Sequence, residues 1–328
     1  MEAGAITKAS PPLVFPEAAM PIDLLQTHKL LDSCEAAIAE RFTVHKLHEA
    51  KDKAALLAEV APKVRAVAGG NVDAKLMDAL PKLEIIANFG VGYDTIDTAA
   101  AKARNIRVTN TPNVLNDAVA EMTVGLMIAL ARRIPQGDQF VRQGKWTAGN
   151  FGLFSELTGK TAGILGLGRI GKEIATRLQA MKMRIVYHGR HRQEGVPYVY
   201  YSDLADMARD SDWLVIVAPG GKDTQGIVSR KVLEALGPKG MLVNVARGTL
   251  VDEAAMLEML TSGALGGAAL DVFENEPDIR DGFRTLDNVV LAPHQGSATH
   301  QTRQAMGALV VANLDAHFAG DPLPSAVV

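Results

Sequence analysis

Three side chains of complementary chemistry lie in the second half of the chain, each at or just after the end of a predicted strand: Arg247, Glu276 and His294. Open α/β sheets bind their ligands at this edge. A guanidinium can hold a carboxylate and polarise the neighbouring keto oxygen through two donors in a rigid fork. An imidazole titrates near neutral pH and can protonate that oxygen as hydride arrives, while a carboxylate on its other nitrogen orients it and favours its protonated form. The three together favour reduction of a 2-keto acid.

Each residue taken alone has a plainer interpretation. Arg247 could form a surface ion pair, Glu276 beside a proline could be an ordinary loop residue, and His294 after a proline could cap a turn. Only the combination of the three favours catalysis. The elements that would position the three side chains therefore decide between the catalytic and the plainer interpretation.

A glycine-rich stretch near the middle of the chain predicts the cofactor. Gly166, Gly168 and Gly171 form a G-x-G-x-x-G between an apolar strand and a helix with one apolar face. The first glycine permits a tight turn, the second lets the backbone approach a pyrophosphate, and the third lets the helix pack close to the strand. The helix N-terminus offers unpaired N–H groups to an anion. A purely structural turn is the alternative; the predicted binding residues are Gly166, Leu167, Gly168, Arg169, Ile170 and Gly171.

The segment after the next predicted strand selects between the two nicotinamide cofactors. NAD-binding folds carry an acidic residue about 20 positions after the glycine turn, but this chain reads Tyr-His-Gly-Arg-His-Arg over 187–192 and has no carboxylate there until Glu194. Arg190 or Arg192 can bind a 2′-phosphate instead. A solvated basic loop is the alternative. We expect NADP(H), with NADH as a weaker substitute.

Length and composition limit the remaining possibilities. A chain of 328 residues can form two domains, and 48% hydrophobic with 22% charged residues is ordinary for a soluble globular protein. The net charge of −3 without a long basic run argues against nucleic-acid binding. Cys34 is the only cysteine, which excludes an intrachain disulfide and a multi-cysteine metal site, and we predict no metal. With no signal-peptide pattern and no apolar segment long enough to span a bilayer, we expect a cytoplasmic protein.

Short apolar strands alternate with helices along most of the chain, which predicts parallel sheets covered by helices on both faces. In the first part we expect strands at Leu13–Phe15, Phe42–Leu47, Val64–Ala68, Leu83–Asn88 and Arg107–Thr109. In the second part we expect them at Gly163–Leu165, Arg184–Tyr187, Trp213–Val217, Met241–Asn244, Ala268–Asp271 and Val289–Leu291. The second set is typical of a doubly wound dinucleotide domain.

Two segments between these strands have a distinct character. Two glycines straddle Val91, so the turn at 89–94 can expose several N–H groups to a carboxylate or phosphate, although a plain strand-to-helix turn is equally consistent. A helix over about 117–133 is apolar nearly all round and must be buried in a core or against a second subunit. The aromatic-rich loop that follows, with Trp146 among glycines and polar residues, is expected to dock onto a partner chain.

Four ordered motifs closely resemble the D-isomer-specific 2-hydroxyacid dehydrogenase family: Gly-Leu-Gly-Arg-Ile-Gly at 166–171, Val-Ala-Arg-Gly at 245–248, Ala-Leu-Asp-Val-Phe-Glu-Asn-Glu-Pro at 269–277 and Pro-His-Gln-Gly-Ser at 293–297. The resemblance implies that Arg247 binds substrate, Glu276 supports the histidine and His294 is the general acid/base. It implies substrate-carboxylate binding by the Val91 and Gly92 amides. It further implies cofactor contacts from Asp271, which would hold the nicotinamide carboxamide, and from Pro219, Val245, His294 and Gly296.

The resemblance also implies an α/β architecture of two doubly wound parallel-sheet domains. Residues 1–110 and 297–328 would form a flavodoxin-like substrate domain, and residues 111–296 a Rossmann-type cofactor domain. A homodimer is implied, with the long helix and the Trp146 loop crossing between subunits.

Within the family the chain looks like the NADPH-preferring glyoxylate/hydroxypyruvate reductases, with hydroxyphenylpyruvate-type reductases as the alternative. Two features depart from the pattern: Pro-Gly-Gly-Lys at 219–222 replaces the more usual Pro-Leu-Thr-Pro, and Ala68–Gly70 on the predicted substrate loop is small. A rival of another class is a dinucleotide-sensing, corepressor-like scaffold that keeps the same three residues. Formate dehydrogenase is disfavoured because those enzymes carry glutamine where this chain has Glu276.

Overall fold

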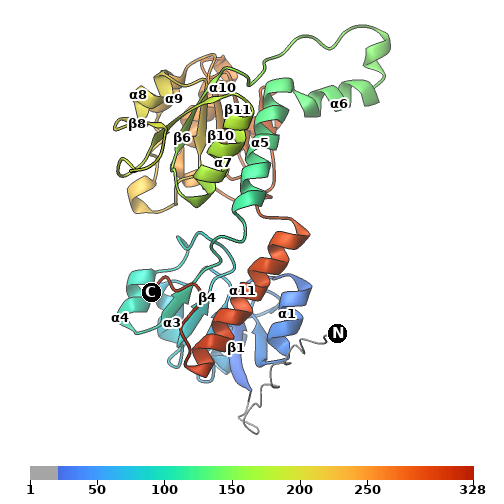
Figure 1. The fold of residues 1–328 in the computed structure, drawn as a ribbon. Helices are drawn as coiled ribbons and strands as arrows, with labels where there is room; N and C mark the ends of the chain where they lie inside the picture. The colour runs from blue at the N-terminus through green and yellow to red at the C-terminus, as the bar shows by residue number, and fades with distance from the viewer. Residues whose placement is uncertain (1–20) are drawn as a thin grey trace, which may run out of the picture.

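The computed structural model describes residues 21–328, and within that range two parallel sheets form two lobes of an α/β fold (Figure 1). The strand predicted at Leu13–Phe15 lies outside the described residues. The two lobes are joined by the segment entering helix α5 (Asn116–Arg132) and by the segment entering helix α11 (His300–Ala319).

The sheet of the first lobe has the strand order β2-β1-β3-β4-β5, which is the flavodoxin-like order. Its strands are β1 (Ile22–Gln26), β2 (Phe42–Lys46), β3 (Ala66–Ala68), β4 (Ile85–Ala87) and β5 (Arg107–Thr109), and every pairing is parallel. The helices between them are α1 (Asp32–Ala39), α2 (Lys53–Val60), α3 (Ala74–Ala79) and α4 (Thr98–Ala103).

Strand β1 was not predicted from the sequence, because polar Asp23 and Gln26 interrupt its apolar run. Both side chains find partners in the structure: Asp23 Oδ1 lies 2.7 Å from His45 Nε2 on the neighbouring strand, and Gln26 Nε2 donates to the His28 carbonyl at 2.9 Å and to Glu35 at 2.7 Å. Gln26 Oε1 has no partner among the described residues. Leu24 and Leu25 are fully buried between them. Helix α4 was likewise missed.

The sheet of the second lobe has the order β12-β11-β10-β9-β6-β7-β8, the doubly wound Rossmann arrangement with one further strand at its end. Its strands are β6 (Thr161–Leu165), β7 (Arg184–His188), β8 (Val199–Tyr201), β9 (Trp213–Ile216), β10 (Met241–Asn244), β11 (Gly267–Leu270) and β12 (Val289–Leu291). The covering helices include α7 (Arg169–Ala180), α8 (Leu204–Arg209), α9 (Arg230–Leu236) and α10 (Glu253–Ser262). The unpredicted β8 is a three-residue edge strand, anchored where the Tyr200 ring packs on Tyr187 with centroids 5.3 Å apart.

Buried strands explain why the predicted positions in this lobe were close to the observed ones. All residues of β6, β9 and β11 are buried, so these strands read as continuous apolar runs rather than as alternating patterns. Burial on both faces requires helices on both sides of the sheet, and α5 supplies part of one side by packing against α7 and β11.

The C-terminal helix α11 packs against α1 and β4 of the first lobe, although it follows the last strand of the second. The chain beyond it also returns to the first sheet, where Ala326 forms an antiparallel bridge with Thr109. Both ends of the described chain therefore contribute to the first lobe.

One segment leaves the body of the molecule. Helix α6 (Ile134–Arg142), the short 3-10 helix η1 (Lys145–Thr147) and the loop after it project away from the second lobe (Figure 1); we call residues 133–156 the arm. No residue of α6 is buried. No helix among residues 21–328 is both long and apolar enough to cross a bilayer.

Candidate active site

The turn between β6 and α7 gives each of its three glycines a different environment. Gly166 has φ +99°, and a β-carbon there would lie 2.7 Å from the Ala218 backbone nitrogen at the end of β9. A β-carbon on Gly171 would overlap the Gly166 carbonyl oxygen, so this glycine permits close packing of helix on strand. Gly168 faces open space beside the helix N-terminus. An open approach at the second glycine is what a pyrophosphate requires.

The loop after β7 presents two arginines to solvent. Arg190 and Arg192 are exposed, and neither forms a hydrogen bond or ion pair with any residue of the described chain, 21–328. The loop itself is fixed: the Gln193 amide donates to the Tyr187 hydroxyl at 2.7 Å, and Gln193 Nε2 donates to the Leu167 carbonyl of the glycine turn at 2.7 Å. The guanidinium groups thus stand on an ordered loop next to the turn, which fits a phosphorylated ribose.

His294 and Glu276 form a direct pair, with His294 Nδ1 2.7 Å from Glu276 Oε2. The other carboxylate oxygen of Glu276 accepts from the Phe273 amide at 3.0 Å. Burial pushes the pKa of Glu276 upward, but the hydrogen bonds from His294 and Phe273 and the positive charges of His294 and Arg247 outweigh it, so the pKa lies below its usual value. The Glu276 carboxylate is therefore ionised. It pairs with His294 Nδ1, so Nε2 of the imidazole remains for another partner.

Asp271 fixes the loop that carries His294. Its side chain is buried, and its two oxygens accept from the Gln295 and Gly296 amides at 2.6 and 2.8 Å, while its carbonyl accepts from the His294 amide at 2.9 Å. These bonds hold His294 in the left-handed region, at φ 54°. Burial raises the pKa of Asp271, and the two amide hydrogen bonds oppose that effect.

Arg247 follows β10 and reaches across to the first lobe. Its Nε lies 3.1 Å from both carboxylate oxygens of Asp94, and its Nη2 lies 3.0 Å from Asp94 Oδ1. The fit is tight on both sides, because a β-carbon on Gly92 would overlap Arg247 Nη2 and one on Gly220 would lie 2.9 Å from Arg247 Cγ. Gly220 belongs to the Pro-Gly-Gly-Lys stretch that departs from the family pattern. Here it makes room for the Arg247–Asp94 pair, which is a different role from contact with the adenine end of a cofactor.

The loop at 89–94 is oriented by two asparagines. Asn88 Nδ2 donates to the Gly90 and Gly92 carbonyls at 3.1 and 2.8 Å, and Asn110 Nδ2 donates to the Val91 carbonyl at 2.9 Å. With the carbonyls held in this way, the amides of Val91 and Gly92 have no acceptor among residues 21–328. Two free N–H groups beside a guanidinium can bind a carboxylate.

Comparison with known proteins agrees with this geometry. The family model described as D-isomer specific 2-hydroxyacid dehydrogenase, NAD binding domain, matches residues 124–296. Glyoxylate/hydroxypyruvate reductase A of Arabidopsis thaliana is 46% identical over 90% of this chain and 95% of the relative. Hydroxyphenylpyruvate reductase of Plectranthus scutellarioides is 44% identical over the same shares. The solved structure of an NADPH-dependent glyoxylate/hydroxypyruvate reductase from Sinorhizobium meliloti, in complex with NADP and malonate, has TM-score 0.88 and 41% identity, covering 94% of this chain and 97% of that one.

The chain belongs to the D-isomer-specific 2-hydroxyacid dehydrogenase family. It is an NAD(P)-dependent oxidoreductase with the two-domain α/β fold of that family, as the sequence predicted. The alternative of a corepressor-like scaffold is not supported, since the named relatives are reductases and dehydrogenases.

In this dehydrogenase the predicted residues gather at the carboxyl ends of the strands. Pro219 and Val245 follow β9 and β10, next to the glycine turn after β6, where the direction of strand order reverses. A cavity of about 290 Å³ adjoins His294 and Glu276 and is lined by apolar residues that include Phe273 and Leu291. No cluster of three metal-ligating side chains occurs in the part of the chain that the structure covers.

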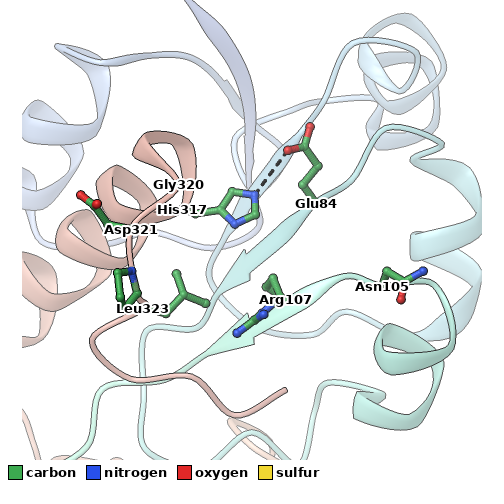
Figure 2. Close-up of a pocket in the computed structure, with 8 residues that line it drawn as sticks. Glu84, Asn105, Arg107, His317, Gly320, Asp321 and Leu323 are labelled. Atoms are coloured by element: carbon green, nitrogen blue, oxygen red, sulfur yellow. Dashed lines mark hydrogen bonds and ion pairs between the residues drawn. The ribbon is translucent and has the colours of Figure 1, made fainter.

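A second cavity lies at the opposite edge of the first sheet, near the C-terminal end of α11 (Figure 2). Glu84 precedes β4 and Arg107 begins β5, so this cavity sits at the amino ends of the strands. Its polar groups are already engaged: Glu84 lies 3.4 Å from His317 Nε2 and also accepts from Arg65, and Arg107 Nε donates to the Val328 carbonyl at 3.1 Å. It is separate from the site around His294.

Asp94, Asn88 and Asn110 are the members of the site that sequence reasoning missed. Asp94 stands in the quoted turn 89–94, but only its contact with Arg247, 153 positions away, shows its importance. The two asparagines each follow directly after a strand, β4 for Asn88 and β5 for Asn110, and this position was the available signal.

Proposed function

We propose that this enzyme uses NADPH to reduce small 2-keto acids, with glyoxylate and hydroxypyruvate as the leading substrates, to D-2-hydroxy acids. The observation that carries the proposal is the 2.7 Å pair between His294 and ionised Glu276 beside the charge of Arg247. In this proposal the proton donor and the carboxylate-binding group act on the same substrate. The names of the relatives support the same substrate class.

In this mechanism each residue has one task. The Val91 and Gly92 amides bind the substrate carboxylate. Asp94 holds Arg247 Nε and Nη2, and the Ala246 carbonyl accepts from Nη1 at 2.7 Å, so Arg247 acts on the carboxylate and the keto oxygen mainly through its positive charge. The bound dinucleotide supplies the hydride. His294 Nε2 donates the proton to the oxygen, and the Glu276 carboxylate stabilises the imidazole while it is protonated. Asp271 keeps the His294 loop in place, and the nicotinamide carboxamide would lie near it.

The cofactor would be bound by residues 166–171 at the α7 N-terminus, with Arg190 and Arg192 on the 2′-phosphate. We expect Arg190→Ala to lower kcat/KM for NADPH by about tenfold to a hundredfold more than for NADH, because one charge-assisted contact is lost. Steady-state rates with both cofactors measure this difference. Arg209→Ala is the matched control, since Arg209 is an exposed arginine paired with Asp206 away from this loop. Equal losses with both cofactors would contradict the assignment.

A panel of keto acids tests the substrate class. Glyoxylate and hydroxypyruvate should give the highest kcat/KM with NADPH. Hydroxyphenylpyruvate is the second candidate, favoured by the 44% identity to a hydroxyphenylpyruvate reductase. Clear preference for an aryl substrate would replace the first proposal with the second.

We further propose that a second copy of the chain covers the arm, giving a homodimer. Trp146 is 66% exposed and Leu153 is 99% exposed, and Ile134 and Val141 on α6 are more than half exposed. A projecting arm with this much apolar surface is typical of an interface. Leu153→Asp combined with Val141→Asp should shift the mass from dimer to monomer in analytical ultracentrifugation.

The domain boundaries that we propose place residues 1–110 and 297–328 in the substrate domain and 111–296 in the cofactor domain. The packing of α11 against α1 and β4 supports this division. We assign the enzyme to the cytoplasm because its single, buried cysteine suits a reducing compartment.

A further inference from the structure

Three basic side chains gather at the carboxyl edge of the first sheet, beside the loop at 89–94, and the catalytic mechanism uses none of them. Arg303, in the first turn of α11, is half-buried and stacks over the Phe89 ring with its guanidinium carbon 5.5 Å from the ring centroid. Its guanidinium forms no hydrogen bond or ion pair with any residue between 21 and 328. Phe89 begins the loop whose amides face the substrate carboxylate.

A half-buried guanidinium without a counter-ion is costly. Burial lowers the pKa of Arg303, yet an arginine stays charged at all ordinary pH values. The ring face of Phe89 compensates only part of the lost hydration. Five N–H donors on a planar fork therefore remain available for an oxygen acceptor.

His28, which follows β1, offers a second donor. The Gly70 amide donates to His28 Nδ1 at 3.3 Å, so in the neutral ring the hydrogen is on Nε2. Burial lowers the pKa of His28, and the neighbouring charges of His48 and Arg303 lower it further. The ring is therefore neutral near pH 7 and presents one N–H.

His48, which follows β2, is the third member. Both of its ring nitrogens are buried without a hydrogen-bond partner among the described residues. The nearest charge is the exposed carboxylate of Glu49, 3.5 Å from Nε2, too far for a hydrogen bond. Because both nitrogens are closed to solvent, His48 lies behind the cluster and adds charge to it without contacting a ligand.

The other carboxylate at this edge cannot neutralise the cluster. Glu35 accepts from Gln26 Nε2 at 2.7 Å, from the Leu30 amide at 2.9 Å and from Lys46 Nζ at 2.7 Å. Its oxygens are therefore already engaged, and the cluster keeps its positive character.

Two glycines connect this cluster to the substrate loop. A β-carbon on Gly69, which has φ +120°, would lie 2.8 Å from the His28 ring, so only glycine lets the β3 loop approach it. A β-carbon on Gly70 would lie 3.1 Å from Asn88 Oδ1, and Asn88 holds the Gly92 carbonyl. The glycines at 69 and 70 thus let the loop after β3 pack directly against His28 and Asn88.

We propose that Arg303, with His28 as a second donor and His48 behind them, forms a distal subsite that binds an oxygen-bearing group, a hydroxyl or a carboxylate, on the substrate chain beyond the keto carbon. This inference rests on the proposed function and narrows it. It assigns the enzyme to hydroxylated and acidic 2-keto acids, in preference to alkyl or aryl ones.

The test compares substrates that differ only beyond the keto carbon. Glyoxylate has no group there, 2-ketobutyrate carries a methyl group where hydroxypyruvate carries a hydroxyl, and oxaloacetate carries a carboxylate. For Arg303→Met we expect the kcat/KM ratio of hydroxypyruvate to 2-ketobutyrate to fall by about tenfold to a hundredfold, the usual loss of a hydrogen bond to a charged group. If a carboxylate is the natural group at this subsite, the kcat/KM ratio of oxaloacetate to 2-ketobutyrate should fall further than the kcat/KM ratio of hydroxypyruvate to 2-ketobutyrate.

Arg303→Lys is the second variant, because it keeps the charge and the contact with Phe89 but loses the fork. It should restore part of the ratio, and a thermal melt of each variant checks folding. Equal losses on all four substrates, or an unchanged ratio while glyoxylate is still reduced, would overturn the distal subsite alone. A wild-type enzyme that reduces none of the four would overturn the proposed function together with it.

Discussion

The carboxyl edges of the two sheets are organised in opposite ways. At the second sheet the polar groups around His294 are already paired within the protein, His294 with Glu276 and Asp271 with two backbone amides, whereas the arginines of the loop after β7 are unpaired within the described chain. At the first sheet the Val91 and Gly92 amides and the Arg303 guanidinium have no acceptor among residues 21–328. The first arrangement fixes geometry, and the second leaves binding capacity for a ligand.

The difference follows from the role that we propose for each edge. Proton transfer needs a donor at a fixed angle and distance, and the protein fixes it in advance because reorganisation during the reaction would raise the barrier. Recognition needs donors that the protein has not already satisfied, since only an unsatisfied donor gains from a bound acceptor. Arg247 belongs to both groups. It extends from the second sheet, and Asp94 of the first lobe holds its Nε and Nη2, so the pair joins the two lobes.

The largest effect is expected at the paired edge. His294→Gln should lower kcat for glyoxylate reduction by about 10²–10⁴, because the general acid is lost. NADPH affinity, measured by fluorescence titration, should change little by comparison. A variant that retains most of its kcat would show that another group supplies the proton.

Glu276→Gln should lower kcat by about tenfold to a hundredfold, since the charge-assisted bond to His294 becomes a neutral one. The carboxylate favours a protonated partner, so its removal should also move the alkaline fall of the reduction rate to lower pH. A pH–rate profile of the variant beside the wild type measures both effects. If the profile keeps its shape and position, Glu276 has only a structural role.

Gly92→Ala tests the contact between the two edges. Its β-carbon would overlap Arg247 Nη2, so the guanidinium must move, and we expect kcat/KM to fall about tenfold. Gly90→Ala is the matched control two residues away, where the nearest atoms to a β-carbon lie at 3.6 Å and no movement is needed. Similar losses in both variants would place the effect in the loop rather than in Arg247.

The smallest effect concerns the engaged carboxylate of the first sheet. Burial alone would raise the pKa of Glu35, but its hydrogen bonds to Lys46, Leu30 and Gln26 lower it to about 2. Because the pKa of Glu35 is lower in the folded protein than in the unfolded chain, its ionised carboxylate stabilises the folded state above about pH 4. This contribution is lost as the pH falls toward 2. Glu35→Gln should therefore cost about 1 kcal/mol at pH 7 and less at pH 3. Urea melts at the two pH values measure the difference; a cost independent of pH would contradict it.

The sequence by itself determined the features that depend on neighbouring residues. The G-x-G-x-x-G turn needs three glycines at fixed spacing, and the structure gives each one the environment that its position predicts. The strands of the second lobe were predicted because burial on both faces leaves a continuous apolar run. The mixed strand β1 carried no such signal, because the partners of its polar side chains lie elsewhere in the chain. Asp23 pairs with His45 on β2, two positions beyond its ladder partner Thr43, and Gln26 donates to the His28 carbonyl and to Glu35.

Only the tertiary structure decided which of the polar residues meet. Asp94 and Arg247 come from different sheets, and Arg303 reaches Phe89 because α11 returns to the first lobe. A periodic pattern records how one element is buried, whereas a contact between distant residues depends on strand order and on how the lobes pack. For this reason the residues that we propose as catalytic could be named from the sequence, while the partner of Arg247 and the unpaired donors beside it could not.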